Sequence, residues 1–347
     1  MNFDLAVVHG VREIGQESWD HLGGGQPFAS YRWYRFGETV LAGDEPVYIV
    51  LSQGDQAIAR GTFWLKRQEP LPISLGAVRR LMQTLINRWP LLMCHSPLAN
   101  APGLILPDPP LRDAALETIA QAALEIARQK RASFVLFPHL ERHETSRGGW
   151  PAGHVPVTVP GPGTRLKIAW PDFESYLKSL RKSARKDYRR HRNRAADQGV
   201  QVTSHREVTA VDEAMVMIRN VEQHHHSPPN PWARLVLENA GMVDATWLTA
   251  EIKDRLVGCG LLLGEGDVRF LALLGLDYSV QYAYFQLVYA AIRCAIEQGV
   301  KVLRGGGGAY ELKQRLGFQL ETRNNVVFAG RGALLHKLGH WVAGNNA

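Results

Sequence analysis

The sequence predicts an α+β protein of two domains, each with a central, mostly antiparallel sheet flanked by helices. At 347 residues the chain is longer than a single hydrophobic core usually spans, so two domains of roughly 160 to 190 residues are expected. Three strand patterns in the second half are separated only by tight turns, which predicts an antiparallel meander. Strands and helices of the first half do not repeat as β-α-β units, which argues against a doubly wound parallel sheet.

The first half alternates short strands and helices. In chain order it predicts a strand at Leu5–Val8, helices at Glu17–Leu22 and Phe28–Leu41, strands at Pro46–Leu51 and Ala57–Leu65, helices at Val78–Asn87 and Leu111–Lys130, and a strand at Ser133–Pro138. The strands on either side of Gly54 and Asp55 form a hairpin, and the aromatic residues of the second helix are expected in the core. Glu141–Thr164 is rich in proline and glycine, which predicts a linker between domains 1–160 and 161–347.

The second half is more regular. It predicts a basic helix at Pro171–Gly199, a strand at Val200–His205, helices at Val211–His225 and Trp232–Ala240, strands at Ala245–Ile252, Leu256–Gly264 and Val268–Leu276, a helix at Gln281–Gln298, a strand at Val300–Arg304, a short helix at Glu311–Leu316 and a last strand at Gln319–Phe328. The acidic and glycine-containing turns between the three central strands define the meander.

The basic helix is the most distinctive feature of the sequence. Lys178–Arg194 contains nine Lys or Arg and one acid, whereas the whole chain has a net charge of +7, so the remainder is close to neutral. Asp172 is a good N-cap and Gly199 a good terminator. Two rows of cations recur at helical spacing: Arg181, Arg185 and Arg189, and Lys182, Lys186 and Arg190. Such a face is either solvated or binds a phosphate-bearing ligand.

Composition excludes several classes of protein and site. The N-terminus lacks the basic and apolar regions of a secretory signal, and no apolar run reaches the roughly 18 residues that span a bilayer. Three scattered cysteines favour a reducing, cytoplasmic setting. Gly305–Gly308 lacks the Gly-Lys-Ser/Thr ending of a Walker A loop, and His224–His226 cannot converge on one ion from adjacent helical positions. No metal site is predicted.

The order of elements in the second half resembles the GNAT acyltransferase fold, and the residues resemble its FemAB-related branch of bacterial acetyltransferase-like proteins. Three stretches carry the resemblance: Trp170–Leu177 with Lys182–Arg185 and Arg189–Arg190, Tyr284–Leu287 with Ala295–Gly299, and Ala309–Phe318. The likeness covers Lys167–Phe328 well and the first half more weakly. It implies tandem GNAT-like domains, of which the first is degenerate and the second is the acyltransferase domain.

The resemblance also implies a donor and candidate site residues. Plain GNAT enzymes bind the pyrophosphate of acetyl-CoA in a glycine-rich basic loop, but Leu274–Tyr284 has one glycine and no basic residue there. Fem-type transferases lack this loop and use aminoacyl-tRNA. The lysine that they use to hold the donor corresponds to Lys313. The candidate catalytic residues are Lys313, Tyr310 and Glu311, with Asp277 as another possible base; the candidate donor-binding residues are Arg181, Lys182, Arg185, Arg189, Tyr278 and Tyr284.

Three functions remain open at the level of sequence. The first is an N-acyltransferase that uses acyl-CoA or a related thioester; the second is a Fem-like aminoacyl-tRNA-dependent transferase acting on a cell-wall precursor or specialised metabolite. The third is a non-enzymatic module that binds an anionic polymer or a membrane surface. For either enzyme we expect a phosphate-bearing donor substrate, a small-molecule or peptide amine acceptor, no tightly bound cofactor and no DNA. Acyl transfer requires one base and one cationic or N–H donor for the oxyanion.

Overall fold

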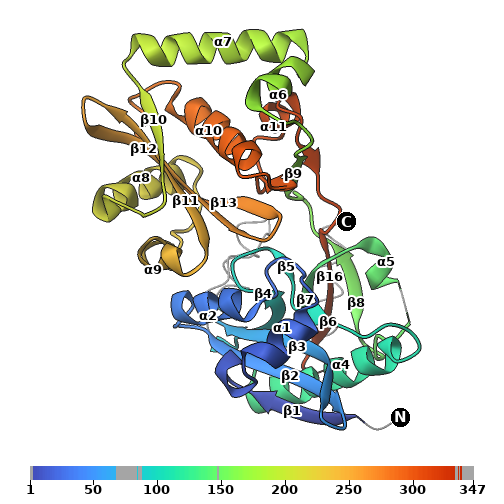
Figure 1. Ribbon diagram of the computed structural model, residues 1–347. Coiled ribbons are helices and arrows are strands. Elements are labelled where there is room, and N and C mark those ends of the chain that lie inside the picture. Colours follow the sequence, from blue (N-terminus) through green and yellow to red (C-terminus); the bar gives the residue numbers. More distant parts are fainter. Residues whose placement is uncertain are drawn as a thin grey trace. The chain divides into compact units, whose positions relative to one another are not determined.

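The computed structural model describes residues 3–67, 84, 88–146, 148–332, 335 and 337. The chain divides into two compact units (Figure 1): unit 1 comprises Met1–Pro162 with Thr322–Ala347, and unit 2 comprises Gly163–Glu321. The α+β class predicted from the sequence is confirmed, with one mostly antiparallel sheet in each unit. Among the described residues, no helix combines the length and apolar character needed to cross a bilayer.

Unit 1 is built on a sheet of strand order β1-β2-β3-β4-β7-β16-β8. Its elements are β1 (Asp4–Val8), η1 (Val11–Glu13), α1 (Gln16–Gly23), α2 (Tyr31–Val40), β2 (Glu45–Gln53), β3 (Gln56–Lys66), β4 (Leu91–Ser96), β5 (Ala101–Pro102), β6 (Leu104–Ile105), α4 (Arg112–Gln129), β7 (Phe134–Leu140), α5 (Arg142–Thr145), β8 (Val155–Thr158) and β16 (Asn325–Gly330). The expected core role of the α2 aromatics is confirmed, since Trp33 and Phe36 are fully buried. The helix expected at Val78–Asn87 lies largely outside the described residues.

Unit 2 is built on a sheet of strand order β10-β11-β12-β13-β14-β9-β15. Its elements are β9 (Thr164–Lys167), α6 (Phe173–Ser179), α7 (Lys182–Asp197), β10 (Gln201–His205), α8 (Val211–His224), α9 (Ala233–Asn239), η2 (Ala240–Met242), β11 (Asp244–Ile252), β12 (Arg255–Glu265), β13 (Val268–Leu276), α10 (Ala283–Glu297), β14 (Val302–Arg304), α11 (Tyr310–Arg315) and β15 (Gln319–Leu320). Helix α10 packs on one face of the sheet, where Leu287 lies over Gly258, and α8 packs on the other, where Met217 lies over Gly275.

The two sheets share one topological feature. Each contains a single parallel pair among its described strands, and in each case the two strands are joined through a helix: β4 to β7 through α4, and β13 to β14 through α10. All other neighbouring strands pair antiparallel. The same crossover therefore occurs once in each unit, as expected of tandem copies of one fold.

Two segments differ from the expected domain layout. The predicted last strand is split: Gln319–Leu320 pairs with β9 in unit 2, whereas Asn325–Gly330 pairs with β7 and β8 in unit 1. The predicted linker Glu141–Thr164 contains the boundary between the units, at Pro162 and Gly163, but it also contains β8, which is a paired strand of the first sheet. Strand β9, the first of unit 2, pairs with β14, and strand β16, the last of unit 1, pairs with β7. In each sheet the added strand therefore lies next to the parallel pair.

The basic region is two helices rather than the single predicted one. Leu180 and Arg181 have extended backbone between α6 and α7. The guanidinium of Arg185 donates to the carbonyl oxygens of Lys178 (3.1 Å) and Leu180 (2.5 Å), which lie at the end of α6. The prediction of an N-cap at Asp172 is confirmed, since its carboxylate accepts from the Ser175 amide at 2.6 Å. The apolar positions keep a helical period across the break, which is why the sequence pattern does not reveal it.

Candidate functional site

The candidate site of unit 2 lies where β13 and β14 diverge. β14 pairs with Val268–Phe270 only, and no described strand pairs with Leu271–Leu276 on that side. The Asp277 amide donates to the Val257 carbonyl of β12 at 2.9 Å. Because hydrogen-bonding direction alternates along a strand, the backbone groups of Leu274 and Leu276 point to the open edge. A substrate lying along this edge could therefore bond to main-chain groups.

The equivalent position in unit 1 is filled by the chain itself. Strand β4 pairs with β7 through Leu91–Met93, but further along His95 and Ser96 pair with β5, which packs against β7. The short strand β6 then pairs with β3. There is no space for a side chain at Gly103, where a Cβ would lie 2.6 to 2.7 Å from atoms of Thr62 and His95. Among the described strands, β5 fills this position in unit 1, whereas no strand fills it in unit 2.

A glycine-rich loop borders this edge and is held by Lys313. Gly305–Gly308 follows β14, and the Lys313 amine donates to the carbonyl oxygens of Gly305 (2.7 Å), Gly307 (2.9 Å) and Gly306 (3.2 Å). Gly306 and Gly308 have positive φ of 65° and 74°, which disfavours any residue with a side chain. Burial lowers the pKa of Lys313 to about 8. At neutral pH the amine is still mostly protonated, and its three N–H groups match the three carbonyl acceptors.

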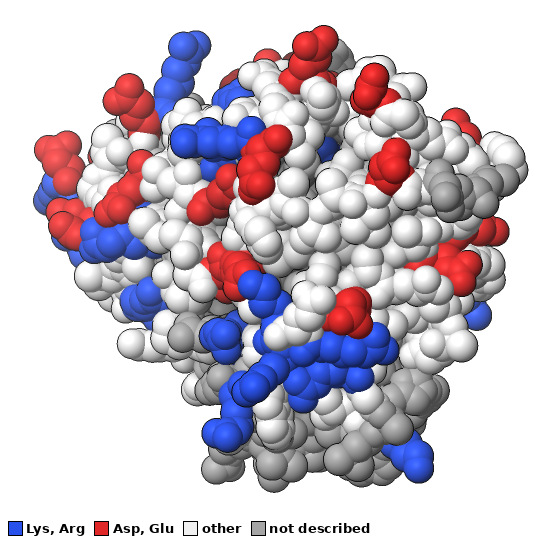
Figure 2. All heavy atoms as spheres, turned by 90° about the horizontal axis from the view of Figure 1, so that it is seen from below, with Lys and Arg blue, Asp and Glu red and all other residues white. Residues whose placement is uncertain are grey.

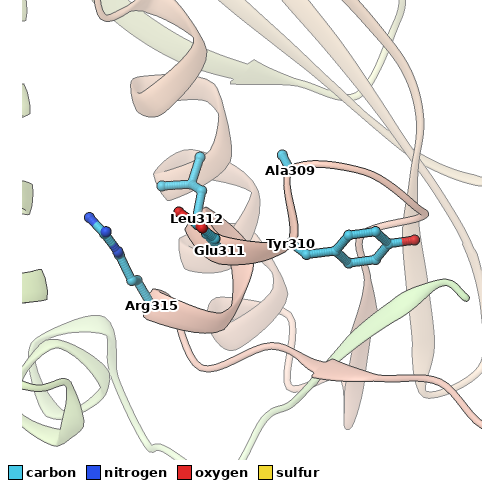
Figure 3. Close-up of a pocket in the computed structure, with 5 residues that line it drawn as sticks. All are labelled: Ala309, Tyr310, Glu311, Leu312 and Arg315. Carbon is cyan, nitrogen blue, oxygen red and sulfur yellow. The ribbon is translucent and has the colours of Figure 1, made fainter. Parts of the chain in front are cut away.

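Tyr310, Glu311 and Lys313 lie on the single short helix α11, as the sequence predicted. A pocket of about 400 Å³ is lined by five residues of this segment: Ala309, Tyr310, Glu311, Leu312 and Arg315. Figure 3 shows the Tyr310 ring and the Arg315 side chain directed to opposite sides of the helix. The three candidates therefore share one helix, and the Lys313 amine is directed to the carbonyls of the glycine-rich loop.

Helix α11 is tied to the basic helices. The Tyr176 hydroxyl of α6 donates to the Leu316 carbonyl at 3.0 Å. Arg315 lies 3.9 Å from the Asp187 carboxylate of α7, which also pairs with Arg190 at 2.9 Å. These contacts place Lys313 and the cationic face of α7 in the same part of unit 2.

Helix α7 presents most of its predicted donor-binding cations to solvent. Arg181, Lys182 and Arg189 are exposed. Its apolar face packs on α10, where the buried His191 ring stacks on Phe285 at a centroid distance of 3.8 Å. Arg185 differs from the expectation, because its guanidinium caps α6 and is half-buried. Figure 2 shows one face of the molecule, on which side chains of both signs occur and Lys and Arg gather in one area.

The junction between β13 and α10 carries a carboxylate where acetyl-CoA enzymes hold a pyrophosphate. Asp277 accepts from the Ser279 hydroxyl (2.5 Å) and amide (2.9 Å) and from Arg255 (2.9 Å). These bonds, chiefly those from Ser279 and then the one from Arg255, lower the pKa of Asp277, so it is a poor general base at neutral pH.

The two tyrosines of this junction, predicted to bind the donor, have different environments. Tyr278 is exposed and its ring stacks on His224 at 4.1 Å. Tyr284 is half-buried and packs edge-on against Phe285. Burial, and to a lesser degree Tyr278, raises the pKa of Tyr284. Tyr278 therefore remains available to a ligand, whereas Tyr284 is mainly part of the packing of α10.

Comparison with known proteins decides the family. A model of the FemAB_like family, described as peptidoglycan biosynthesis/recognition, matches residues 10–346. The chain belongs to the FemAB_like family. Membership supports a transferase, as the sequence resemblance implied. No curated protein sequence matches this chain.

Solved structures establish the fold of this FemAB_like chain. FemX superposes with a TM-score of 0.63 at 10% identity, covering 96% of this chain and 99% of FemX. A tandem GNAT protein from the clavulanic acid biosynthesis pathway gives 0.57 at 12% identity, covering 95% and 99%. L-PGS from Bacillus licheniformis gives 0.52 at 11%, covering 95% and 96%. The tandem GNAT-like architecture predicted from the sequence is confirmed.

Two features of the FemAB_like site were not found from the sequence. Asn220 of α8 donates through its side-chain amide to the Leu276 carbonyl at the open edge (3.2 Å). Arg165 of β9 and Arg304 of β14 are direct cross-strand partners beside the glycine-rich loop. Neither belongs to a recognisable motif, and only strand pairing between distant segments brings them to the site.

Proposed function

We propose that this protein is an N-acyltransferase in which unit 2 transfers an activated acyl group from a phosphate-bearing donor to an amine. The open edge of β13, bordered by the loop that Lys313 holds, is the observation that carries the proposal. The cationic face of α7 supports it, because α6 and α7 contact α11 directly. The family description, peptidoglycan biosynthesis/recognition, favours a peptidoglycan precursor as the amine acceptor.

The chemistry needs only groups of the kind that this site offers. The amine nitrogen attacks the acyl carbonyl carbon, and a C–N bond forms while the C–O or C–S bond to the carrier breaks. The amine loses one proton, and the departing oxygen or sulfur takes one up. The tetrahedral intermediate carries an oxyanion, which backbone N–H groups of the open edge would stabilise by hydrogen bonds. The Lys313 ammonium, whose three N–H groups bond to the loop carbonyls, would stabilise it through its positive charge. Glu311, exposed at the pocket, is the proposed base, because the lowered pKa of Asp277 makes that carboxylate less suitable.

Of the two donors considered, the structure favours aminoacyl-tRNA over acyl-CoA. The Asp277 carboxylate occupies the junction that would otherwise bind a pyrophosphate and would repel it. Helix α7 has 16 residues and is therefore about 24 Å long. Exposed cations spread over that length suit the successive phosphates of a nucleic acid better than the compact phosphate groups of one CoA molecule. A purely electrostatic binding module would not need the open strand edge or the Lys313 contacts.

Equilibrium binding distinguishes the donors. Labelled aminoacyl-tRNA is retained on a filter with the protein and is then displaced by unlabelled aminoacyl-tRNA, uncharged tRNA or acetyl-CoA. We expect aminoacyl-tRNA to compete best, uncharged tRNA less well and acetyl-CoA only at far higher concentration. Binding of both tRNA species should weaken steeply with salt. Displacement by acetyl-CoA at concentrations as low as those of aminoacyl-tRNA would favour the thioester donor instead.

A further inference from the structure

A row of side chains crosses four strands on one face of the unit 2 sheet. The register places Phe270 of β13 beside Arg304 of β14, Arg304 opposite Arg165 of β9, and Arg165 opposite Gln319 of β15. Their chain neighbours Leu303 and Leu166 are buried in the core with α10. Because side chains alternate between the faces of a strand, this row lies on the face opposite α10 and α7. It begins at the last paired residue before β13 and β14 diverge.

The two arginines of this row are not equally neutralised. Arg304 forms a two-pronged ion pair with Glu321, from Nε to Oε1 at 2.7 Å and from Nη2 to Oε2 at 3.0 Å. Arg165 is half-buried, and no hydrogen bond or ion pair of its guanidinium is found within the described part of the chain. Its Nε in particular is buried without a partner. Like charges directly opposite each other across two strands are destabilising. The unneutralised guanidinium of Arg165 therefore costs the fold stability at this position.

We propose that Arg165 binds a carboxylate of the amine acceptor, with Arg304 beside it. Arg165, Arg304 and Glu321 together carry one net positive charge, which a single carboxylate neutralises, whereas a phosphate dianion would leave the group negative. The planar guanidinium matches a carboxylate through two parallel hydrogen bonds, the arrangement that Arg304 already makes with Glu321. The position on the face opposite α7 separates this group from the cations assigned to the donor. Calling its ligand the acceptor rests on the proposed function; the carboxylate site itself does not.

The test compares two probes that differ only in charge at one end. N-acetyl-L-alanine carries a carboxylate, and N-acetyl-L-alaninamide carries a neutral amide in its place. Isothermal titration at constant ionic strength should show binding of the first probe and little of the second. Arg165→Gln should weaken binding of the carboxylate at least about tenfold. Arg165→Lys keeps the positive charge but cannot form two parallel hydrogen bonds, so it should recover only part of the affinity for the carboxylate.

Lys167→Gln is the matched control. Lys167 lies on the same strand and the same face but is exposed, so its removal lowers the net charge equally and should leave carboxylate binding unchanged. Because Arg165→Gln removes an unfavourable like-charge contact, the variant should melt no lower than the parent protein. Equal binding of the carboxylate to the parent, Arg165→Gln and Lys167→Gln proteins would overturn the site.

The outcome for this site is separable from that of the proposed function. Loss of carboxylate binding in Arg165→Gln without any detectable acyl transfer would keep the site and remove the proposed function. Acyl transfer together with unchanged carboxylate binding in Arg165→Gln would keep the proposed function and remove the carboxylate site.

Discussion

Replacing Lys313 with Met is expected to slow acyl transfer by about 10²- to 10³-fold at saturating donor, because the developing oxyanion loses a nearby positive charge and the glycine-rich loop loses its support. The substitution preserves side-chain length but removes the charge and the contacts with the Gly305, Gly306 and Gly307 carbonyls. The loop then loses its support beside the open edge at the same time as the site loses a cation. Donor affinity should change much less than the rate, because the stabilised charge develops in the transition state.

Single-turnover rates measure this effect separately from binding. Lys301→Met is a suitable control, since Lys301 is exposed and pairs only at the surface with Asp267. The Lys301→Met protein should transfer the acyl group at the rate of the parent protein. Equal rates for Lys313→Met and the parent protein would remove Lys313 from the mechanism and leave the C-terminal motif as a structural element.

The lowered pKa of Lys313 gives the same prediction a pH dependence. If the ammonium is the active form, transfer is supported below the folded pKa of about 8 and is lost as pH rises through it. The contribution of Lys313 to the free energy of unfolding changes in the opposite direction and increases as pH rises. Between about 8 and the unfolded pKa of about 10.4, the unfolded chain binds more protons, so this group adds stability as pH rises. The Lys313→Met protein should lack both dependences, whereas a lysine with only a packing role would leave the pH–rate profile unchanged.

Removing three exposed cations of α7 is expected to weaken tRNA binding by about 10- to 100-fold near physiological salt. The variant replaces Lys182, Lys186 and Arg189 with Gln; all three are exposed. Each phosphate contact that is lost should lower the slope of log affinity against log salt by a little under one, so the three together should lower it by about 2 to 3. Filter binding of aminoacyl-tRNA over a range of salt concentrations gives the slope.

Arg185→Ala is the contrasting variant on the same helix. Because Arg185 caps the end of α6 rather than facing solvent freely, its removal should lower the melting temperature while leaving the salt slope nearly unchanged. If the triple variant binds tRNA with the parental affinity and slope, the basic face of α7 is only a solvated surface.

Local sequence signals predicted much of the fold. The periodicity of Leu111–Lys130 and Gln281–Gln298 matches α4 and α10 to within two residues, since an amphipathic helix needs only one buried stripe. The Gly54–Asp55 turn predicted the β2–β3 hairpin. Local signals did not reveal the break between α6 and α7, because Leu180 keeps the helical spacing of the buried face and is itself buried in the extended segment.

Non-local pairing accounts for most of what could not be predicted. Strands β5, β6 and β9 have two to four residues each, too few for a pattern of alternation. Strand β16 returns to unit 1 although its sequence follows unit 2 directly. At the site, proximity in sequence correctly placed Tyr310, Glu311 and Lys313 on one helix. Strand register places Arg165 opposite Arg304 and lets β5 fill the edge in unit 1. Neither arrangement can be predicted from the neighbouring residues in the sequence.

The central claim is that unit 2 moves an acyl group from a tRNA ester to an amine. The most direct test supplies the full-length protein with aminoacyl-tRNA bearing labelled amino acids, together with amine-bearing peptidoglycan precursors, and follows the label by mass spectrometry. A parallel reaction contains labelled acetyl-CoA in place of the tRNA. The account predicts that label leaves the tRNA and appears in a new amide on the precursor, with Lys313→Met slowing its appearance. Label that moves only from acetyl-CoA, or moves from tRNA equally fast without the protein, would contradict it.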